Sequence, residues 1–244
     1  MSYTDFAYLY DALIDEDYIK WTDYIEAVFL RYGKKPSLVL DLACGTGSIT
    51  TLLAKRGYDM IGLDKSADML AVAMQKKGSL PICYTNQDMT SFELYGTVDA
   101  IVCTLDSINY VLEAEKVKKL FRLVKNYLNP NGLFIFDVNS EYKFSKILGN
   151  NCFVTDTGKI FYTWENVYRP KSKICTYKLT FFVRNGEKYY RKDEIQKQRA
   201  YSQEQISQML DEANLPVLDC FDGITFNKPC KTTERLMFIC KNIC

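Results

Sequence analysis

The chain has 244 residues, of which 48% are hydrophobic and 25% are charged, and its formal net charge is +1. A chain of this length buries roughly three quarters of its unfolded surface, which is enough for one complete hydrophobic core. The near-neutral charge disfavours a dedicated nucleic-acid binder, because such proteins carry a marked excess of lysine and arginine.

The first half of the chain alternates strand and helix signals. Helical periodicity predicts helices over 48–56, around 69–74 and through 117–124, each placed between two apolar runs. This alternation is typical of a parallel sheet covered by helices on both faces. The apolar runs predict strands at 38–42, 58–63, 80–84, 98–103 and 133–138.

After residue 140 the pattern changes to antiparallel strands. Strands are predicted at 159–168, 175–183 and 188–201, and Asn185-Gly186 is a strong hairpin signal. Apolar and polar residues alternate between Cys175 and Val183, so one face of this ribbon is apolar and is expected to pack over another part of the protein. A capping box at Ser202-x-x-Gln205 begins a helix over 202–213, and strands at 217–221 and 235–240 close the sheet.

These elements predict an α/β fold with a doubly wound, Rossmann-like, mixed seven-stranded sheet and an inserted antiparallel β-ribbon lid. We expect residues 1–141 and 202–244 to form the core, with 1–36 as an N-terminal helical lid and 142–201 as the insertion over the substrate. The first residues lack the basic segment followed by an apolar segment that is typical of a signal peptide, and the sequence has no run of 18 apolar residues. We therefore expect a soluble cytoplasmic protein without a membrane segment.

The chain contains no histidine. This absence excludes a Ser-His-Asp triad and an imidazole metal ligand, so any acid–base step must use Tyr, Asp, Glu, Lys or water. The nine cysteines are an odd number without a C-x-x-C pair, which indicates reduced thiols and no zinc site. A reaction that works mainly by positioning, without a metal, is favoured.

The segment from Val39 to Ser48 is an apolar strand that runs into a glycine turn and then into a helix. Gly45 and Gly47 allow the backbone to approach a ligand closely. A dinucleotide site usually has a third glycine where Thr50 stands, and no Gly-Lys-Ser/Thr follows as in a phosphate-binding P-loop. The turn therefore favours a nucleoside without phosphates.

Acidic residues follow the predicted strand ends, where ligands bind in open α/β sheets. Asp41 lies beside the glycine turn, Asp64 ends the second strand, and Asp88 with Met89 follows the third. A carboxylate about 20 residues beyond the turn suits a ribose, so we assign Asp64 to the sugar hydroxyls. Met69 can pack against adenine, and Asp88 can accept from its amine.

Three motifs together resemble the class I S-adenosylmethionine-dependent methyltransferases: Asp41-x-Ala43-Cys44-Gly45-Thr46-Gly47, Asp64-x-Ser66-x-x-Met69-Leu70 and Gln87-Asp88-Met89. The resemblance implies S-adenosylmethionine as cofactor and S-adenosylhomocysteine as product. It implies that the glycines line the methionine part, that Asp88 and the Met89 backbone bind adenine, and that carbonyls near Ala43 and Cys103 take the ammonium. The predicted cofactor-binding residues are Tyr8, Trp21, Asp41, Ala43, Gly45, Thr46, Gly47, Asp64, Lys65, Met69, Asp88, Met89, Cys103 and Ser107.

A closer resemblance is to small-molecule methyltransferases with a β-insertion after the fifth strand, which include amino-sugar and glycine-type N-methyltransferases. Three stretches carry it: Phe6-Ala7-Tyr8-x-Tyr10-Asp11 with Tyr18 and Trp21, Leu105-Asp106-Ser107-x-Asn109-Tyr110, and Glu194-x-Gln196-x-Gln198-Arg199-x-Tyr201. Relatives often have histidine where Gln196 stands, and glutamine can hydrogen-bond a substrate instead.

The methyl acceptor is expected to be an amine nitrogen of a small molecule. A neutral amine needs only desolvation and orientation, whereas a hydroxyl usually needs a base or a metal. Tyr10, Tyr110 and Tyr162 are expected to shield the site and to stabilise a cationic product by cation–π contact. The predicted catalytic residues are Tyr10, Asn109, Tyr110, Gln196 and Arg199.

Simpler structural roles compete with several of these assignments. Asp41 can brace the glycine turn, Met69 can be an ordinary core residue, and Asn109 can cap the helix that begins near Glu113. Arg199 can be a cross-strand partner on a solvated face of the ribbon, as can Glu165 and Tyr201.

Two other functions also stay open at this point: methylation of a tRNA or rRNA base through the basic ribbon, and a non-catalytic protein that binds the cofactor as a partner. The ribbon's basic residues are Lys171, Lys173, Lys188, Arg191, Lys192, Lys197 and Arg199. The sequence does not decide between a monomer and a homodimer.

Overall fold

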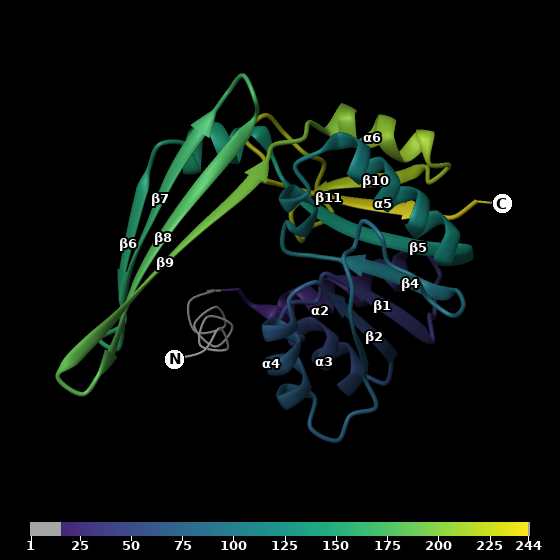
Figure 1. The fold of residues 1–244 in the computed structure, drawn as a ribbon. Helices are drawn as coiled ribbons and strands as arrows, with labels where there is room; N and C mark the ends of the chain where they lie inside the picture. Colours follow the sequence, from purple (N-terminus) through teal and green to yellow (C-terminus); the bar gives the residue numbers. More distant parts are fainter. Residues whose placement is uncertain (1–15, 244) are drawn as a thin grey trace.

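The computed structural model describes residues 16–243 and contains two separate sheets (Figure 1). The larger sheet has seven strands in the order β10-β11-β5-β4-β1-β2-β3. Strands β1 to β5 pair in parallel, while β11 is antiparallel to β5 and to β10. The predicted mixed seven-stranded sheet is therefore confirmed. Its strands are β1 (Leu38–Leu42), β2 (Asp59–Asp64), β3 (Cys83–Asn86), β4 (Val98–Cys103), β5 (Leu128–Asn139), β10 (Val217–Asp222) and β11 (Arg235–Lys241).

Helices cover both faces of the larger sheet (Figure 1). Alternate residues of β1 point to opposite faces, so Val39 packs with α2 and α3 while Leu40 packs with α5 and α6. Helix α4 lies beside α3 and contacts β3. The helices are α2 (Tyr18–Arg31), α3 (Ser48–Lys55), α4 (Ala67–Lys77), α5 (Ala114–Tyr127) and α6 (Gln203–Glu212), with a short 3-10 turn η1 (Ser107–Tyr110) after β4.

Helix boundaries follow local chemistry. The Ser202 hydroxyl accepts from the backbone N–H of Gln205, and the Gln205 side chain accepts from the Ser202 N–H, so the predicted capping box begins α6. In α5, the predicted stripe ending at Val124 is buried against the sheet. In the part of the chain that the structure covers, no helix has both the length and the apolar character to cross a membrane.

The smaller sheet is antiparallel and projects beside the core (Figure 1). Its order is β6-β7-β8-β9, formed by β6 (Cys152–Asp156), β7 (Ile160–Arg169), β8 (Ile174–Asn185) and β9 (Lys188–Arg199). The last three strands match the prediction. Strand β6 and the preceding π-helical turn η2 (Lys143–Leu148) were not predicted; every residue of β6 is exposed, so it has no alternating burial pattern.

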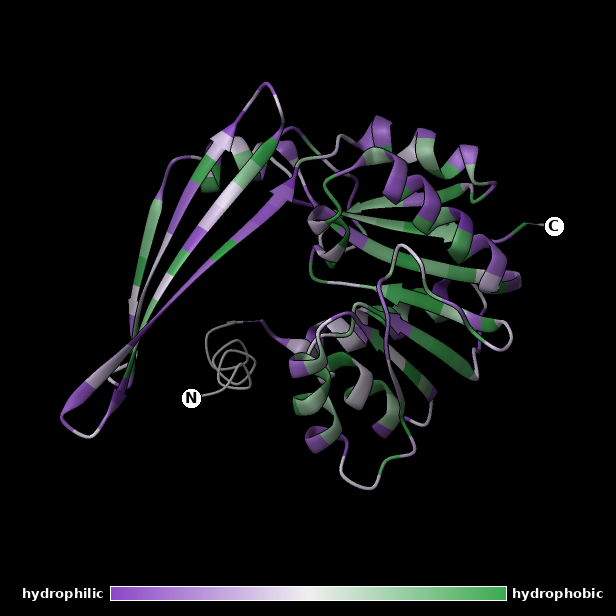
Figure 2. Cartoon of the chain, in the orientation of Figure 1, coloured by the Kyte–Doolittle hydropathy of each residue, from purple (hydrophilic) through white to green (hydrophobic). Residues whose placement is uncertain are grey.

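One face of the small sheet packs on the η2 turn that precedes it. Cys175 and Tyr177 of β8 are buried together with Phe144 of η2, whereas Thr176 between them is half-buried and Lys178 after them is exposed. The alternation predicted for this strand is therefore confirmed. Figure 2 shows that the strands of the larger sheet are mainly hydrophobic, whereas the end of β9 that joins the core is hydrophilic.

Two predicted strand boundaries were wrong. Strand β3 begins at Cys83 instead of residue 80, because Pro81 cannot donate to a ladder and the Ile82 N–H bonds to the Leu80 carbonyl. Strand β5 begins at Leu128 instead of residue 133. Its pairing with β4 has a register shift, and Asn131 adopts a left-handed backbone with φ 63° inside this irregularity.

Candidate functional site

The glycine turn connects β1 to α3 through an unusual run of backbone conformations. Ala43, Gly45 and Gly47 all have positive φ, at 62°, 56° and 71°. The Gly47 N–H donates to the Cys44 carbonyl at 2.9 Å, and Gly47 then caps the N-terminus of α3. A Cβ atom built on Gly45 would meet no atom within 4 Å, so the space above this residue is open. The turn can therefore cradle a ligand at Gly45.

Gly47 serves a different purpose from Gly45. A Cβ on Gly47 would lie 2.3 Å from the hydroxyl of Tyr84 in β3, and a Cβ on Gly62 in β2 would lie 2.4 Å from the same ring. Both glycines thus make room for Tyr84 beneath the turn. Beyond the close approach of a ligand predicted for Gly47, this glycine therefore has a packing role set by Tyr84, which lies 37 positions later.

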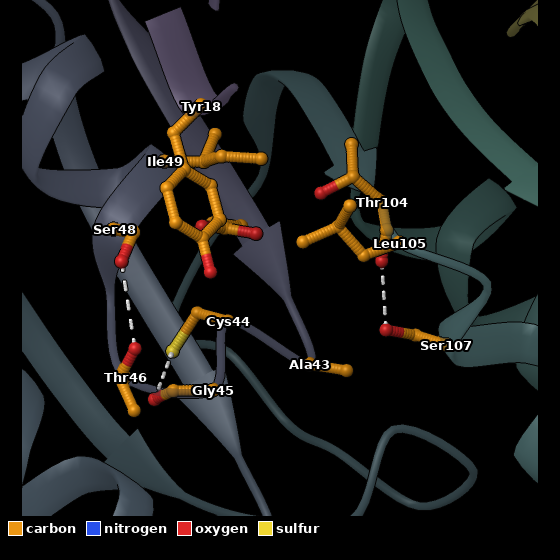
Figure 3. A pocket seen from close by; sticks show the side chains of 11 residues that line it. Tyr18, Ala43, Cys44, Gly45, Thr46, Ser48, Ile49, Thr104, Leu105 and Ser107 are labelled. Carbon is orange, nitrogen blue, oxygen red and sulfur yellow. Dashed lines mark hydrogen bonds between the residues drawn. The ribbon is translucent and has the colours of Figure 1, made fainter. Parts of the chain in front are cut away.

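A pocket opens beside the glycine turn (Figure 3). Its free space, counted out to the open mouth and including solvent, is about 380 Å³. Five predicted residues line it, and the others are their chain neighbours or come from α2, the start of α3 and the end of β4. The lining residues are Tyr18, Asp41, Ala43, Cys44, Gly45, Thr46, Ser48, Ile49, Thr104, Leu105 and Ser107.

Asp64 braces the glycine turn from the end of β2. Its carboxylate accepts from the Gly45 N–H at 2.9 Å and from the Ser66 N–H at 2.8 Å. Burial raises the pKa of this carboxyl above its ordinary value. Each carboxylate oxygen has a second lone pair, so Asp64 can accept from two hydroxyls of a sugar as well. The neighbouring Lys65 is exposed, and Met69 is half-buried in the first turn of α4.

Asp41 is buried in the pocket wall. Only 2% of the residue is exposed, and its carboxylate accepts from the Thr50 hydroxyl on α3. Burial raises the pKa of Asp41 to about 7, and the charge of Asp64 acts in the same direction. The hydrogen bond to Thr50 ties β1 to α3, which agrees with the alternative, structural role considered for Asp41.

Asp88 and Met89 follow β3 and are joined to the end of β2. The Gln87 N–H donates to the Asp64 carbonyl at 3.1 Å, so this loop lies next to Asp64. Asp88 is exposed and accepts from both the N–H and the hydroxyl of Thr90 at 2.7 Å, while Met89 packs on the edge of the core. Neither residue lines the pocket described above.

Three further predicted cofactor residues lie in different surroundings. Ser107 lines the pocket and its hydroxyl donates to the Thr104 carbonyl at 2.8 Å (Figure 3). The Cys103 side chain is fully buried in the core, which leaves only its backbone for a ligand. Trp21 is 2% exposed and is held by the Arg235 guanidinium, 5.3 Å from its ring centre, outside the pocket lining. Tyr8 and Tyr10 lie outside the described residues.

Lys76 was not predicted as a site residue. Its ammonium, on α4, donates to the hydroxyls of Thr46 at 2.8 Å and Ser48 at 2.7 Å. These bonds fasten α4 to the glycine turn at the pocket. Sequence spacing gave no signal for this contact, because the partners are about one helix and one strand apart in the chain.

Tyr110 and Gln196 are brought together by the docking of strand β9 beside the η1 turn. The Tyr110 hydroxyl donates to Gln196 Oε1 at 2.9 Å, and Gln196 Nε2 donates to Glu194 at 2.7 Å. Glu194 and Gln196 share one face of β9, and Tyr110 lies in the η1 turn after β4. Two predicted catalytic residues, 86 positions apart, are therefore neighbours.

Asn109 and Arg199 are engaged by backbone groups. Buried Asn109 donates to the Arg199 carbonyl at 2.8 Å and accepts from the Asn139 N–H at 2.8 Å. It does not cap α5, whose N-cap is Glu113. The Arg199 guanidinium donates to the Leu112 carbonyl at 2.9 Å. These bonds join the small sheet to the core, and contact of either side chain with an acceptor stays a prediction.

Comparison with known proteins identifies the family. The family profile described as a methyltransferase domain matches residues 39–132. A protein of Geobacillus sp. (strain WCH70) that is classed among methyltransferases is 35% identical over 99% of this chain and 100% of its own length. The chain belongs to the S-adenosylmethionine-dependent methyltransferases. A crystal structure of such a methyltransferase from Clostridium acetobutylicum shares 38% identity with this enzyme, covers 99% of both chains and superposes with a TM-score of 0.92.

Membership of this family confirms S-adenosylmethionine as the cofactor of the enzyme. The residues present fit this group: the space above Gly45 is open, the Asp64 carboxylate stands at the end of β2, and the pocket is lined by the glycine turn and the loop after β4. When bound, the cofactor supplies an electrophilic methyl group on a sulfonium. Within residues 16–243, no group of three or more His, Cys, Asp or Glu side chains is placed to hold a metal ion.

Proposed function

We propose that this methyltransferase moves the methyl group to an amine nitrogen of a small molecule. The observation that carries the proposal is the chemistry of the groups between the loop after β4 and strand β9. Asp106, Glu194 and Gln196 offer carboxylate and amide oxygens there, which accept hydrogen bonds from N–H groups. The chain has no histidine to remove a proton from a hydroxyl. An acceptor that binds through N–H groups suits this surface best.

In this proposal, residues in the pocket and beside it bind different parts of the cofactor. The open space above Gly45 takes the methionine part, and the carbonyl of Ala43, together with that of Cys103, takes the ammonium. Asp64 accepts from the ribose hydroxyls while it holds the turn. Asp88 and the Met89 backbone, placed next to Asp64 by the β3 loop, bind adenine.

The protein's part in the reaction is to orient and desolvate the acceptor nitrogen. Alignment of nitrogen, methyl carbon and sulfur in near-attack geometry lowers the barrier without a metal. Tyr110, fixed by Gln196, and Tyr162 of β7 supply aromatic faces that favour a cationic product. The insertion, residues 142–201, which carries the small sheet, serves as the lid over the acceptor.

Two N-methyltransferases among the relatives support an amine acceptor, while a third relative is an O-methyltransferase. A glycine/sarcosine N-methyltransferase of Halorhodospira halochloris is 29% identical, and an amino-sugar N,N-dimethyltransferase of Streptomyces fradiae is 31% identical, each over about half of this chain. A ubiquinone biosynthesis O-methyltransferase of Rickettsia canadensis matches a similar share. The sugar N-methyltransferase KedS8 covers 96% of this chain with a TM-score of 0.79, and at 18% identity this likeness establishes the shared fold alone.

An RNA acceptor is disfavoured by how the basic residues of the small sheet are used. Lys173 pairs with Glu141 at 3.0 Å, and Arg191 pairs with Asp193 at 2.9 Å. Arg199 turns inward to a backbone carbonyl. Several of the charges that suggested an RNA surface are therefore already engaged within the protein. The proposal also places the enzyme in the cytoplasm, and the eight described cysteines, all free thiols, suit a reducing compartment.

A radiolabel transfer screen tests the proposed acceptor. The purified enzyme is incubated with S-adenosylmethionine labelled on the methyl group and with matched pairs of small molecules that differ only in an amine or a hydroxyl. We expect label on the amine members and no more than background on the hydroxyl members. Label on hydroxyls alone, or on RNA alone, would overturn the proposal.

A further inference from the structure

The loop after β4 adopts a backbone that side chains normally avoid. Leu105 and Asp106 are consecutive residues with φ of 58° and 52°, in the left-handed region where a Cβ atom is disfavoured. Leu105 and Ser107, on either side of Asp106, line the cofactor pocket. Conformations of this kind persist at functional sites when the surrounding structure holds them in place.

Asp106 is held by three separate elements. Its backbone N–H donates to Asp137 of β5 at 2.9 Å. Its two carboxylate oxygens accept from Arg235 of β11 at 3.1 Å and from Gln198 of β9 at 2.5 Å. The Gln198 amide is itself oriented by the Tyr177 hydroxyl, which donates to its oxygen at 2.6 Å. The position of the Asp106 carboxylate is therefore fixed from the core and from the small sheet.

The Asp106 carboxylate remains partly accessible. Its side chain is 18% exposed, whereas the side chain of Asp137 below it has no exposure. Each carboxylate oxygen of Asp106 makes one hydrogen bond and keeps a further lone pair. Asp137 Oδ1 has no hydrogen-bond partner among residues 16–243, but it is buried out of reach of a ligand, so the acceptor surplus open to a ligand lies on Asp106. A ligand that brings N–H donors matches this surplus.

We propose that Asp106 holds the ammonium group of the acceptor beside the transferred methyl and takes one of its protons. This inference rests on the proposed function. The ammonium gives a proton to a carboxylate oxygen of Asp106, which becomes neutral, and the freed lone pair of nitrogen forms a bond to the methyl carbon. The bond from that carbon to sulfur breaks, and its electron pair stays on sulfur. The product leaves as a methylated ammonium, and Asp106 releases its proton to solvent.

Other charged and titratable groups face the same place and set the local field. Arg235 and Lys143 are positive, and their charge is opposed by carboxylates from several elements. Burial, together with the charge of Asp106, raises the pKa of Tyr110 and of Tyr177. The groups are Arg235 of β11, Lys143 of η2, Asp137 of β5, Tyr110 of η1, Tyr177 of β8, Glu194 of β9, Glu16 and Glu234.

A binding experiment tests this role without knowledge of the acceptor. Sinefungin, in which an amine-bearing carbon replaces the methylsulfonium, places an ammonium at the transfer position, and S-adenosylhomocysteine has none there. Calorimetric dissociation constants of both ligands are compared for the wild type, for Asp106→Asn and for Asp106→Gly. Asparagine and glycine both tolerate the left-handed backbone, so either variant can keep the loop. Asp193→Asn, on an exposed position of β9, is the matched control.

We expect both Asp106 variants to bind sinefungin at least tenfold more weakly than the wild type does, with S-adenosylhomocysteine changed less than threefold. The control should bind both ligands as the wild type does. Equal losses for the two ligands would show a merely structural role and overturn the inference, as would unchanged sinefungin binding. Failure of the amine screen with intact cofactor binding would instead count against the proposed function.

Discussion

The buried carboxyl of Asp41 predicts that this protein loses stability as the pH rises toward neutrality. Asp41 is 2% exposed and accepts from the Thr50 hydroxyl, and burial raises its pKa to about 7. The folded protein therefore holds a proton more tightly than the unfolded chain does. The stabilisation that this proton provides is complete below the unfolded pKa, and it is lost as the pH rises through the folded pKa.

The size of the effect follows from the shift. A carboxyl moved from 3.8 to about 7 changes the free energy of unfolding by about 4 kcal/mol in total, because each pKa unit corresponds to about 1.4 kcal/mol. Roughly 3 kcal/mol of this falls between pH 5 and pH 8. Asp41→Asn removes the titration and keeps a side-chain oxygen for Thr50, so it should flatten this part of the stability profile.

Urea unfolding gives the free energy of unfolding at pH 5 and at pH 8 for the wild type, for Asp41→Asn and for a control, Asp59→Asn. Asp59 is an exposed carboxylate at the start of β2. We expect the wild type and the control to lose stability over this range, and Asp41→Asn to lose about 3 kcal/mol less. Some slope should persist in every variant, because burial also raises the pKa of Asp137 to about 6. Parallel profiles for wild type and Asp41→Asn would refute the argument.

Three further substitutions test the packing that shapes the site. Gly62→Ala should lower the free energy of unfolding, measured by urea titration, by about 1 to 3 kcal/mol, because its Cβ would lie 2.4 Å from the Tyr84 ring. The control Gly96→Ala has open space around its Cβ and should be neutral. Equal losses in the two variants would contradict this prediction. Asn109→Ala should cost about 2 to 4 kcal/mol by the same assay, because it leaves backbone partners from two elements unpaired; a loss below about 1 kcal/mol would exclude this bracing role. Ser202→Ala should lower the melting temperature by removing the cap of α6, at about 1 kcal/mol, and an unchanged melting temperature would show that the capping box is dispensable.

Features set by local sequence were predictable, and features set by distant contacts were not. The glycine turn and Asp64 could be found from spacing alone, because a strand, a turn and the next strand end lie within about 25 residues. The bond between Tyr110 and Gln196 depends on where β9 docks, 86 positions later, and no local pattern encodes that. The resemblance to a family placed both residues in the site but not in contact.

The same limit explains what the sequence analysis missed. Tyr84 was seen only as part of a strand, because its partners Gly47 and Gly62 are brought beneath the turn by sheet pairing. Asp106 was quoted within a motif but not chosen as a site residue. Its importance comes from Asp137 and Arg235, which belong to strands formed 31 and 129 positions later.

Calorimetric titration with S-adenosylhomocysteine tests the central claim most directly, with the wild type, Asp64→Ala and Asp59→Ala compared at one pH. We predict one site per chain in the wild type, at least a thirtyfold weaker site in Asp64→Ala, since about 2 kcal/mol or more of charge-assisted hydrogen bonding is lost, and no change in Asp59→Ala. The account would be contradicted if the wild type did not bind S-adenosylhomocysteine and bound a nicotinamide dinucleotide instead. It would also be contradicted if Asp64→Ala bound S-adenosylhomocysteine as tightly as the wild type does.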